Sequence, residues 1–140
     1  MRTLLKIFIC TVLAAPITSS QGQTAFGLEA WLKQDRGFKL ALVKGFIDVA
    51  KEDKVTLRLP TEYYVKELDN LVENSIKNRD EARLKTSVGI ALKTIAVMDC
   101  DWDNGKDRFE EARAFLGEAT FDFYKKNYPA KYQKLINGCR

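Results

Sequence analysis

The chain contains no histidine among its 140 residues. Histidine is the usual general base near neutral pH, and it completes the Ser-His and Cys-His nucleophile systems and most zinc sites. The sequence also has no GxSxG, GxxxxGK(S/T) or GxGxxG motif, so it carries no signature of the common serine hydrolases or of nucleotide-binding loops. We therefore expect a protein that is not an enzyme. Its many Asp and Glu residues leave a hydrolase with a carboxylate pair as an open alternative.

An apolar run near the N-terminus is preceded by basic residues and followed by small polar ones. Arg2 and Lys6 precede the run, which spans Ile7–Ile17 and is followed by Thr18, Ser19 and Ser20. This order is typical of a secretory signal peptide, and the run is too short to span a bilayer. We predict that residues 1–20 are a signal peptide and that residues 21–140 form a single helical domain, which is periplasmic or secreted.

The end of this segment is compatible with cleavage before Gln21 or after Gly22. Retention as an uncleaved membrane anchor and lipidation of Cys10 are the alternatives. Cleavage would lower the net charge from +4 to +2, because Arg2 and Lys6 are both lost. A charge of this size does not indicate nucleic acid or an acidic membrane as the partner. We expect the partner to be another protein of the envelope or periplasm, and we expect no stable membrane anchor after cleavage.

Cysteine is scarce, and only two of the three cysteines lie outside the predicted signal peptide. In an oxidising compartment, an even number of cysteines indicates disulfide bonding. We therefore predict a bond between Cys100 and Cys139. It would close a loop of about 40 residues and contribute about 4 kcal/mol in the chain-entropy model. The alternative is a pair of free thiols that serve as a redox centre or as metal ligands, although the sequence contains no CxxC motif.

Apolar residues recur every three or four positions over most of the remaining chain, which is the period of an amphipathic helix. An alternating stretch at 55–59, held extended by Pro60, is the exception. We predict an all-α fold of five to six helices that pack orthogonally or as a bundle around a central apolar helix, with one disulfide. The expected helices span residues 28–34, 38–50, 61–77, 83–98 and 107–116, and shorter ones lie between Gly117 and Gly138 on either side of Tyr128 and Pro129.

The stretch DCDWDNGKDRFEE at 99–111 has the ligand spacing of an EF-hand calcium loop. Positions 1, 3, 5, 9 and 12 of such a loop would be Asp99, Asp101, Asp103, Asp107 and Glu110. The position that normally holds glycine is Asn104, and the glycine follows one place later. The pattern nevertheless makes calcium a possible ligand, and a calcium-binding structural or signalling protein is the alternative function.

The same residues also fit a loop that binds no metal. Asp107 and Glu110 have the spacing of a helix-capping box, and Asn104-Gly105 is a tight-turn dipeptide. A basic C-terminus would neutralise the carboxylates through Lys125, Lys126, Lys131, Lys134 and Arg140. We favour this scaffold interpretation. Calcium binding and an acidic surface for a partner protein remain the other two.

Aromatic residues are concentrated near the C-terminus, at Phe121, Phe123, Tyr124, Tyr128 and Tyr132. They would either pack in the core or form a second candidate surface for a partner. Trp102 lies between charged residues of the acidic stretch, so it would be either a lid over the core or an exposed anchor.

Several features resemble the Tai-type periplasmic immunity proteins, which neutralise cell-wall amidase effectors delivered by type VI secretion. The resemblance covers 31–100 and rests on an early tryptophan, Trp31, on Gly45, Phe46 and Asp48 in the first long helix, on Pro60 before the second, and on Cys100 after the third. Where members of that group usually have a cysteine just before the proline, this chain has Arg58-Leu59-Pro60. The resemblance implies a small exported helical protein that acts by protein binding, immunity-like or as an envelope accessory factor, and it transfers no binding residue.

Overall fold

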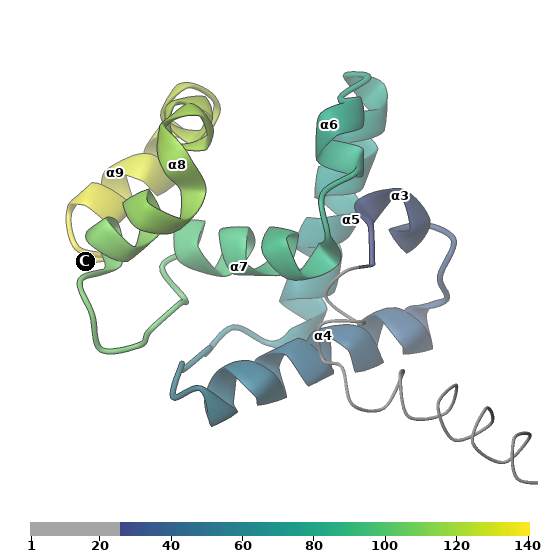
Figure 1. Cartoon of the computed structure of the whole chain (residues 1–140), viewed down its shortest axis with the longest axis horizontal. Helices are drawn as coiled ribbons and strands as arrows, with labels where there is room; N and C mark the ends of the chain where they lie inside the picture. Colours follow the sequence, from purple (N-terminus) through teal and green to yellow (C-terminus); the bar gives the residue numbers. More distant parts are fainter. Residues whose placement is uncertain (1–25) are drawn as a thin grey trace, which may run out of the picture.

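The computed structural model describes residues 26–140, and this part of the chain is all-α, as predicted (Figure 1). The predicted signal peptide, residues 1–20, lies outside the described residues. The helices are α3 (Leu28–Trp31), α4 (Arg36–Glu52), α5 (Thr61–Lys77), α6 (Glu81–Leu84), α7 (Val88–Met98), α8 (Arg108–Asn127) and α9 (Pro129–Ile136). The described residues form seven helices, compared with the five to six predicted. The polar gap after α5 contains the additional one-turn helix α6, and the predicted helix 107–116 continues past Gly117 within α8. No described helix is both long and apolar enough to cross a membrane.

Helix α7 is the central apolar helix, and eight of its eleven residues are buried. It contacts α4, α5, α8 and α9. In Figure 1, α7 runs across the middle of the molecule with α4 below it. Helices α5 and α6 rise at one end of α7, and α8 and α9 rise at the other. Helix α7 is therefore flanked by a pair of helices at each end and by α4 beneath it.

The predicted helix 83–98 is interrupted, which corrects the sequence-based expectation. The backbone around residue 87 pairs with the start of the described chain, because Leu28 N donates to Thr86 O over 3.0 Å and Val88 N donates to Phe26 O. This pairing keeps Ser87 extended, and its hydroxyl caps α7 by accepting from Ile90 N. One predicted helix is thus split into α6 and α7.

Two hydrophobic clusters make up the core, and α7 contributes to both. The larger cluster contains thirteen buried residues from α3, α4, α5 and α7, whereas the smaller contains only Val97, Met98, Ala112 and Leu135. Trp102 packs against both clusters, with its ring 6.3 Å from that of Phe46. Of the two interpretations of this tryptophan, the structure shows the lid.

Residues with left-handed backbone conformation mark the ends of several helices. Cys100 follows α7 with a φ of 59°, and Cys139 follows α9 with a φ of 63°. In each case, backbone amides just beyond the helix donate to carbonyls of its last turn, as at many helix C-termini. Gly117, with a φ of 71°, breaks the helical geometry inside α8 where the sequence predicts a helix end. Both half-cystines thus lie at helix ends.

Candidate functional site

Asp101 is a buried residue of the acidic loop, residues 99–111, and it anchors this loop to a neighbouring segment. Its side chain is almost fully buried and accepts three hydrogen bonds: from Arg58 N at 2.8 Å, from Leu59 N at 3.0 Å and from the Tyr64 hydroxyl at 2.5 Å. A buried carboxylate needs such donors, because water is not available to solvate it. Asp101 therefore joins the loop after α7 to the segment that leads into α5.

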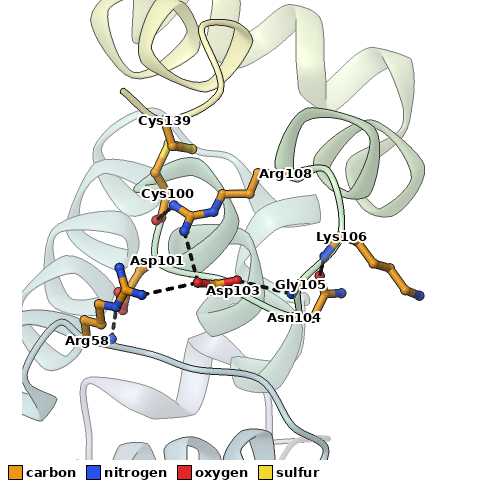
Figure 2. A network of polar contacts seen from close by, with 9 residues as sticks. All are labelled: Arg58, Cys100, Asp101, Asp103, Asn104, Gly105, Lys106, Arg108 and Cys139. Atoms are coloured by element: carbon orange, nitrogen blue, oxygen red, sulfur yellow. Dashed lines mark hydrogen bonds and ion pairs between the residues drawn. A yellow bond between two sulfur atoms is a disulfide. The ribbon is translucent and has the colours of Figure 1, made fainter.

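Asp103 organises the exposed part of the acidic loop (Figure 2). One carboxylate oxygen accepts from Gly105 N, and the other contacts the guanidinium groups of Arg108 at 3.2 Å and Arg58 at 3.4 Å. The Gly105 amide, helped by the two arginines, lowers the pKa of Asp103 below its usual value. The backbone of Asp103 also exchanges hydrogen bonds with Thr56. The side chain is thus bound within the protein.

Asp99 connects the acidic loop to α5 and α9. Its side chain is 7% exposed and accepts from the Tyr63 hydroxyl at 2.7 Å and from Lys131 Nζ at 2.7 Å. Burial and the hydrogen bond to Asp99 raise the pKa of Tyr63 well above its usual value. Burial alone would lower the pKa of Lys131, but the hydrogen bond and the charge of Asp99 outweigh it, and this pKa is raised. Lys131 also lies 3.6 Å from Glu67.

The predicted disulfide between Cys100 and Cys139 is confirmed (Figure 2). Their Cα atoms are 5.6 Å apart, and the bond joins the residues that follow α7 and α9. Arg108 donates to the carbonyl oxygen of Cys100 over 2.9 Å. The acidic loop is therefore held to the C-terminus by a covalent bond, with Arg108 bracing the same residue.

The remaining EF-hand positions serve as a helix cap. Asp107 precedes α8, and its carboxylate accepts from Glu110 N at 2.9 Å, as the capping spacing predicts. Within residues 26–140, no group of three or more His, Cys, Asp or Glu side chains is placed to hold a metal ion. Five basic residues near the C-terminus were expected to neutralise the loop. Among the ion pairs of the described residues, Lys131 is the one of these five that pairs with a loop carboxylate, that of Asp99. Asp103 is instead paired with Arg58 and Arg108.

A cleft lies on the opposite side of α7 from α4, between α5–α6 and α8–α9, and we name it the α5–α8 cleft. Its wider hollow has a volume of about 340 Å³ and shares Leu71 and Tyr124 with a smaller one of about 50 Å³. Helix α7 forms the floor with Ile90, Ala91, Thr94, Ile95 and Met98, which recur along one helical stripe. A hollow of this size is within the range that proteins use to bind ligands.

The two walls of the cleft differ in chemistry. Helix α5 contributes Glu67, Asn70, Leu71 and Asn74, one helical face that is mostly polar. The opposite wall contains Tyr124, Tyr128 and Lys131. Burial raises the pKa of Tyr124 to about 12, despite the opposing effect of Arg83. This wall includes two of the five C-terminal aromatic residues that the sequence offers as a candidate surface.

The other C-terminal aromatics also pack against neighbouring aromatic rings. The Phe121 ring lies 5.4 Å from that of Phe109 and 5.2 Å from that of Tyr132, both in edge-to-face geometry. Phe123 lies beneath the guanidinium of Arg83, 4.2 Å from its ring centroid. Tyr124 and Tyr128 also pack against each other and against Phe123, so these two cleft residues take part in the aromatic packing as well.

The α5 wall of the cleft was not predicted from the sequence. One local signal was available: Asn70 and Asn74 lie one turn apart inside a long helix, although asparagine disfavours helix interiors. Comparison of the chain with protein-family profiles, with curated proteins and with solved structures finds no match. The assignment of a function therefore rests on the geometry of the cleft and the loop.

Proposed function

We propose that this protein acts in the periplasm or outside the cell by binding another protein, and that the α5–α8 cleft is its binding surface. The observation that carries the proposal is the open hollow of about 340 Å³ over α7. The acidic loop is the weaker candidate, because Asp99, Asp101 and Asp103 are already bonded within the protein.

The floor of the cleft offers apolar surface to a partner. Ile90 is 53% exposed, although it belongs to the most apolar helix of the described chain. Burying a fully exposed isoleucine side chain stabilises a complex by roughly 1.5–3 kcal/mol, so covering Ile90 would contribute about half of that. Polar residues such as Thr94 and Thr120 line the same hollow. An apolar floor with polar groups at its margin is the usual layout of a protein-binding site.

The disulfide supports the proposed location. Such bonds persist in oxidising compartments and are rare in the reducing cytosol. The bond also fixes α9, and with it Lys131, against the acidic loop. One wall of the cleft would therefore be stabilised by export. An immunity-like or envelope accessory role is the form of protein binding that the resemblance to the Tai-type proteins favours.

Two isoleucines with equal exposure give a matched test. Ile90 lies in the cleft and is 53% exposed, whereas Ile76 lies outside the cleft residues and is 52% exposed. The exported protein and its Ile90→Arg and Ile76→Arg variants would be cross-linked to their partners in cells and captured for mass spectrometry. We expect a partner that Ile90→Arg loses and Ile76→Arg keeps. If every captured protein is retained by Ile90→Arg, the cleft is not the binding surface.

A further inference from the structure

Helix α9 buries little surface of its own. Of its eight residues, Leu135 is the one that is buried within the described chain, and it packs in the smaller cluster with Val97, Met98 and Ala112. An isolated helix of eight residues is unstable in water. Ordering that many residues costs more free energy than burying a single leucine provides. Helix α9 therefore needs further contacts to stay docked.

The polar and aromatic contacts of α9 are weak. Its ion pairs with the rest of the described chain both involve Lys131, whose Nζ lies 2.7 Å from Asp99 and 3.6 Å from Glu67. The Lys131 side chain is 35% exposed, so water weakens these pairs. The Tyr132 ring packs edge to face against Phe121, and this contact joins α9 to α8 rather than to the central helix. Without another link, α9 would be loosely attached.

The disulfide is the strongest link between α9 and the central helix. Cys139 follows α9 and Cys100 follows α7, and their Cα atoms are 5.6 Å apart. A covalent bond at this place keeps the end of α9 beside its docking site even when the helix is not docked. It therefore gives α9 a high effective concentration at that site and removes much of the entropic cost of docking. The docking of α9 thus depends on the bond.

Most of the acidic loop is held independently of α9. Asp101 accepts its hydrogen bonds from the segment that leads into α5 and from α5 itself. Asp103 contacts Arg58 and Arg108, and Arg108 also donates to the carbonyl oxygen of Cys100. All these partners precede α9, and so do the thirteen residues of the larger cluster. Loss of α9 would therefore leave the remainder of the fold in place.

We propose that the Cys100–Cys139 bond is a redox switch: when it is reduced, α9 undocks and loses its helical structure, while residues 28–127 keep their fold. Both cysteines are partly exposed, so a thiol reagent can reach them. A thiolate of a dithiol attacks one sulfur and forms a mixed disulfide, and the second thiol then displaces the other cysteine. Two electrons and two protons pass from the dithiol, which becomes a cyclic disulfide, to the two cysteines.

Undocking changes the surroundings of Asp99. The carboxylate loses the ammonium group of Lys131 and keeps the hydrogen bond from the Tyr63 hydroxyl. The small hollow of the α5–α8 cleft loses Lys131 from its lining. The oxidised and reduced proteins therefore differ at the α9 end of the cleft. The switch does not rest on the proposed function, because it concerns the folded chain without a partner.

Nitrogen-15 NMR relaxation of the purified protein tests the switch residue by residue. In the oxidised protein, we expect backbone order parameters of about 0.85 in both α9 and α5. After reduction with dithiothreitol, those of residues 130–139 should fall below about 0.6, and those of α5 should stay near 0.85. Reoxidation with oxidised glutathione should restore the order of α9.

Two variants separate the bond from the other contacts of α9. The double variant Cys100→Ala, Cys139→Ala should reproduce the reduced state in the absence of a reductant. Lys131→Ala, measured with the disulfide intact, removes both ion pairs of α9. Its order parameters in α9 should stay near 0.85, because the covalent link is kept.

Three results would overturn the inference. A rigid α9 in the reduced protein or in the double cysteine variant would show that its non-covalent contacts are sufficient. Loss of order in α5 as well would show that the bond holds the whole fold and not α9 alone. Release of α9 by Lys131→Ala would assign its docking to the ion pairs. None of these results affects the proposed function, which the Ile90→Arg variant tests separately.

Discussion

The acidic loop and the α5–α8 cleft hold their polar side chains in opposite states. In the loop, Asp99 and Asp101 are buried and fully engaged with hydroxyl, ammonium and amide donors. In the cleft, the amides of Asn70 and Asn74 face solvent and have no partner in the described chain. The dense group of carboxylates in the sequence therefore lies where loop and helices are held together, and the surface proposed to bind a partner lies elsewhere.

Removing the disulfide that holds the acidic loop to the C-terminus should have the largest effect on stability. The double variant Cys100→Ala, Cys139→Ala is expected to lower the free energy of unfolding by about 4 kcal/mol, because the bond closes a loop spanning 39 residues of separation. Urea unfolding measures the change, and reduction of the parent protein with a dithiol should reproduce it. A loss below about 1 kcal/mol would show that the non-covalent contacts hold the loop without the disulfide.

Removing a carboxylate of the loop should destabilise the protein far more than removing an amide of the cleft. Asp101→Ala leaves two backbone amides and the Tyr64 hydroxyl without their acceptor, so we expect a loss of about 2–4 kcal/mol in the free energy of unfolding. Asn74→Ala removes an exposed side chain inside a helix and should leave the free energy of unfolding unchanged or raise it by up to about 0.7 kcal/mol, because alanine favours a helix interior. Similar losses for both variants, measured in urea, would remove the distinction between loop and cleft.

Tyr63 and Tyr64, which donate hydrogen bonds to the acidic loop, should lose their protons only at unusually high pH. The pKa values of Tyr63 and Tyr64 are raised by burial and by hydrogen bonds to Asp99 and Asp101. Raised folded-state values give stability that is present below the unfolded pKa of about 10 and is lost as pH rises further. At about pH 11, ultraviolet difference spectra should show these two groups still protonated while the protein is folded. Ionisation of all five tyrosines with ordinary pKa values would contradict the loop contacts.

Calcium should have the smallest effect on the loop. The oxygens of Asp101 and Asp103 already accept from groups of the protein, and a bound ion would have to replace those contacts. We expect no shift in melting temperature when millimolar calcium or EDTA is added, because a ligand stabilises only the state that binds it. A rise with calcium that EDTA reverses would instead support the calcium-binding alternative.

Local patterns predicted much of this fold. The bounds 61–77 of α5, the break at Gly117 and the pairing of Cys100 with Cys139 all follow from periodicity, backbone preference and cysteine parity. The break between α6 and α7 was missed, because its cause is a pairing with Phe26, about sixty residues away in the sequence. A contact between residues so far apart in the sequence does not change the local pattern of apolar residues, from which helices are predicted.

The candidate site was predicted less completely than the fold. The sequence favours a loop that binds no metal and leaves calcium as an alternative. The burial of Asp101, with its bonds from Arg58 and Leu59, supports the favoured interpretation. The cleft could not be predicted, because its floor and walls come from different helices. Asn70 and Asn74 were the one visible hint, as polar residues that a helix interior disfavours.

Photo-cross-linking from two exposed positions tests most directly whether the cleft, and not the acidic loop, meets the partner. A photoreactive residue would replace Asn70 in the cleft or Lys106 in the loop of the protein expressed in cells, and both positions are exposed. We predict a covalent adduct with a partner protein from position 70 and none from position 106. An adduct from position 106 without one from position 70 would contradict the account and return the acidic loop as the docking surface.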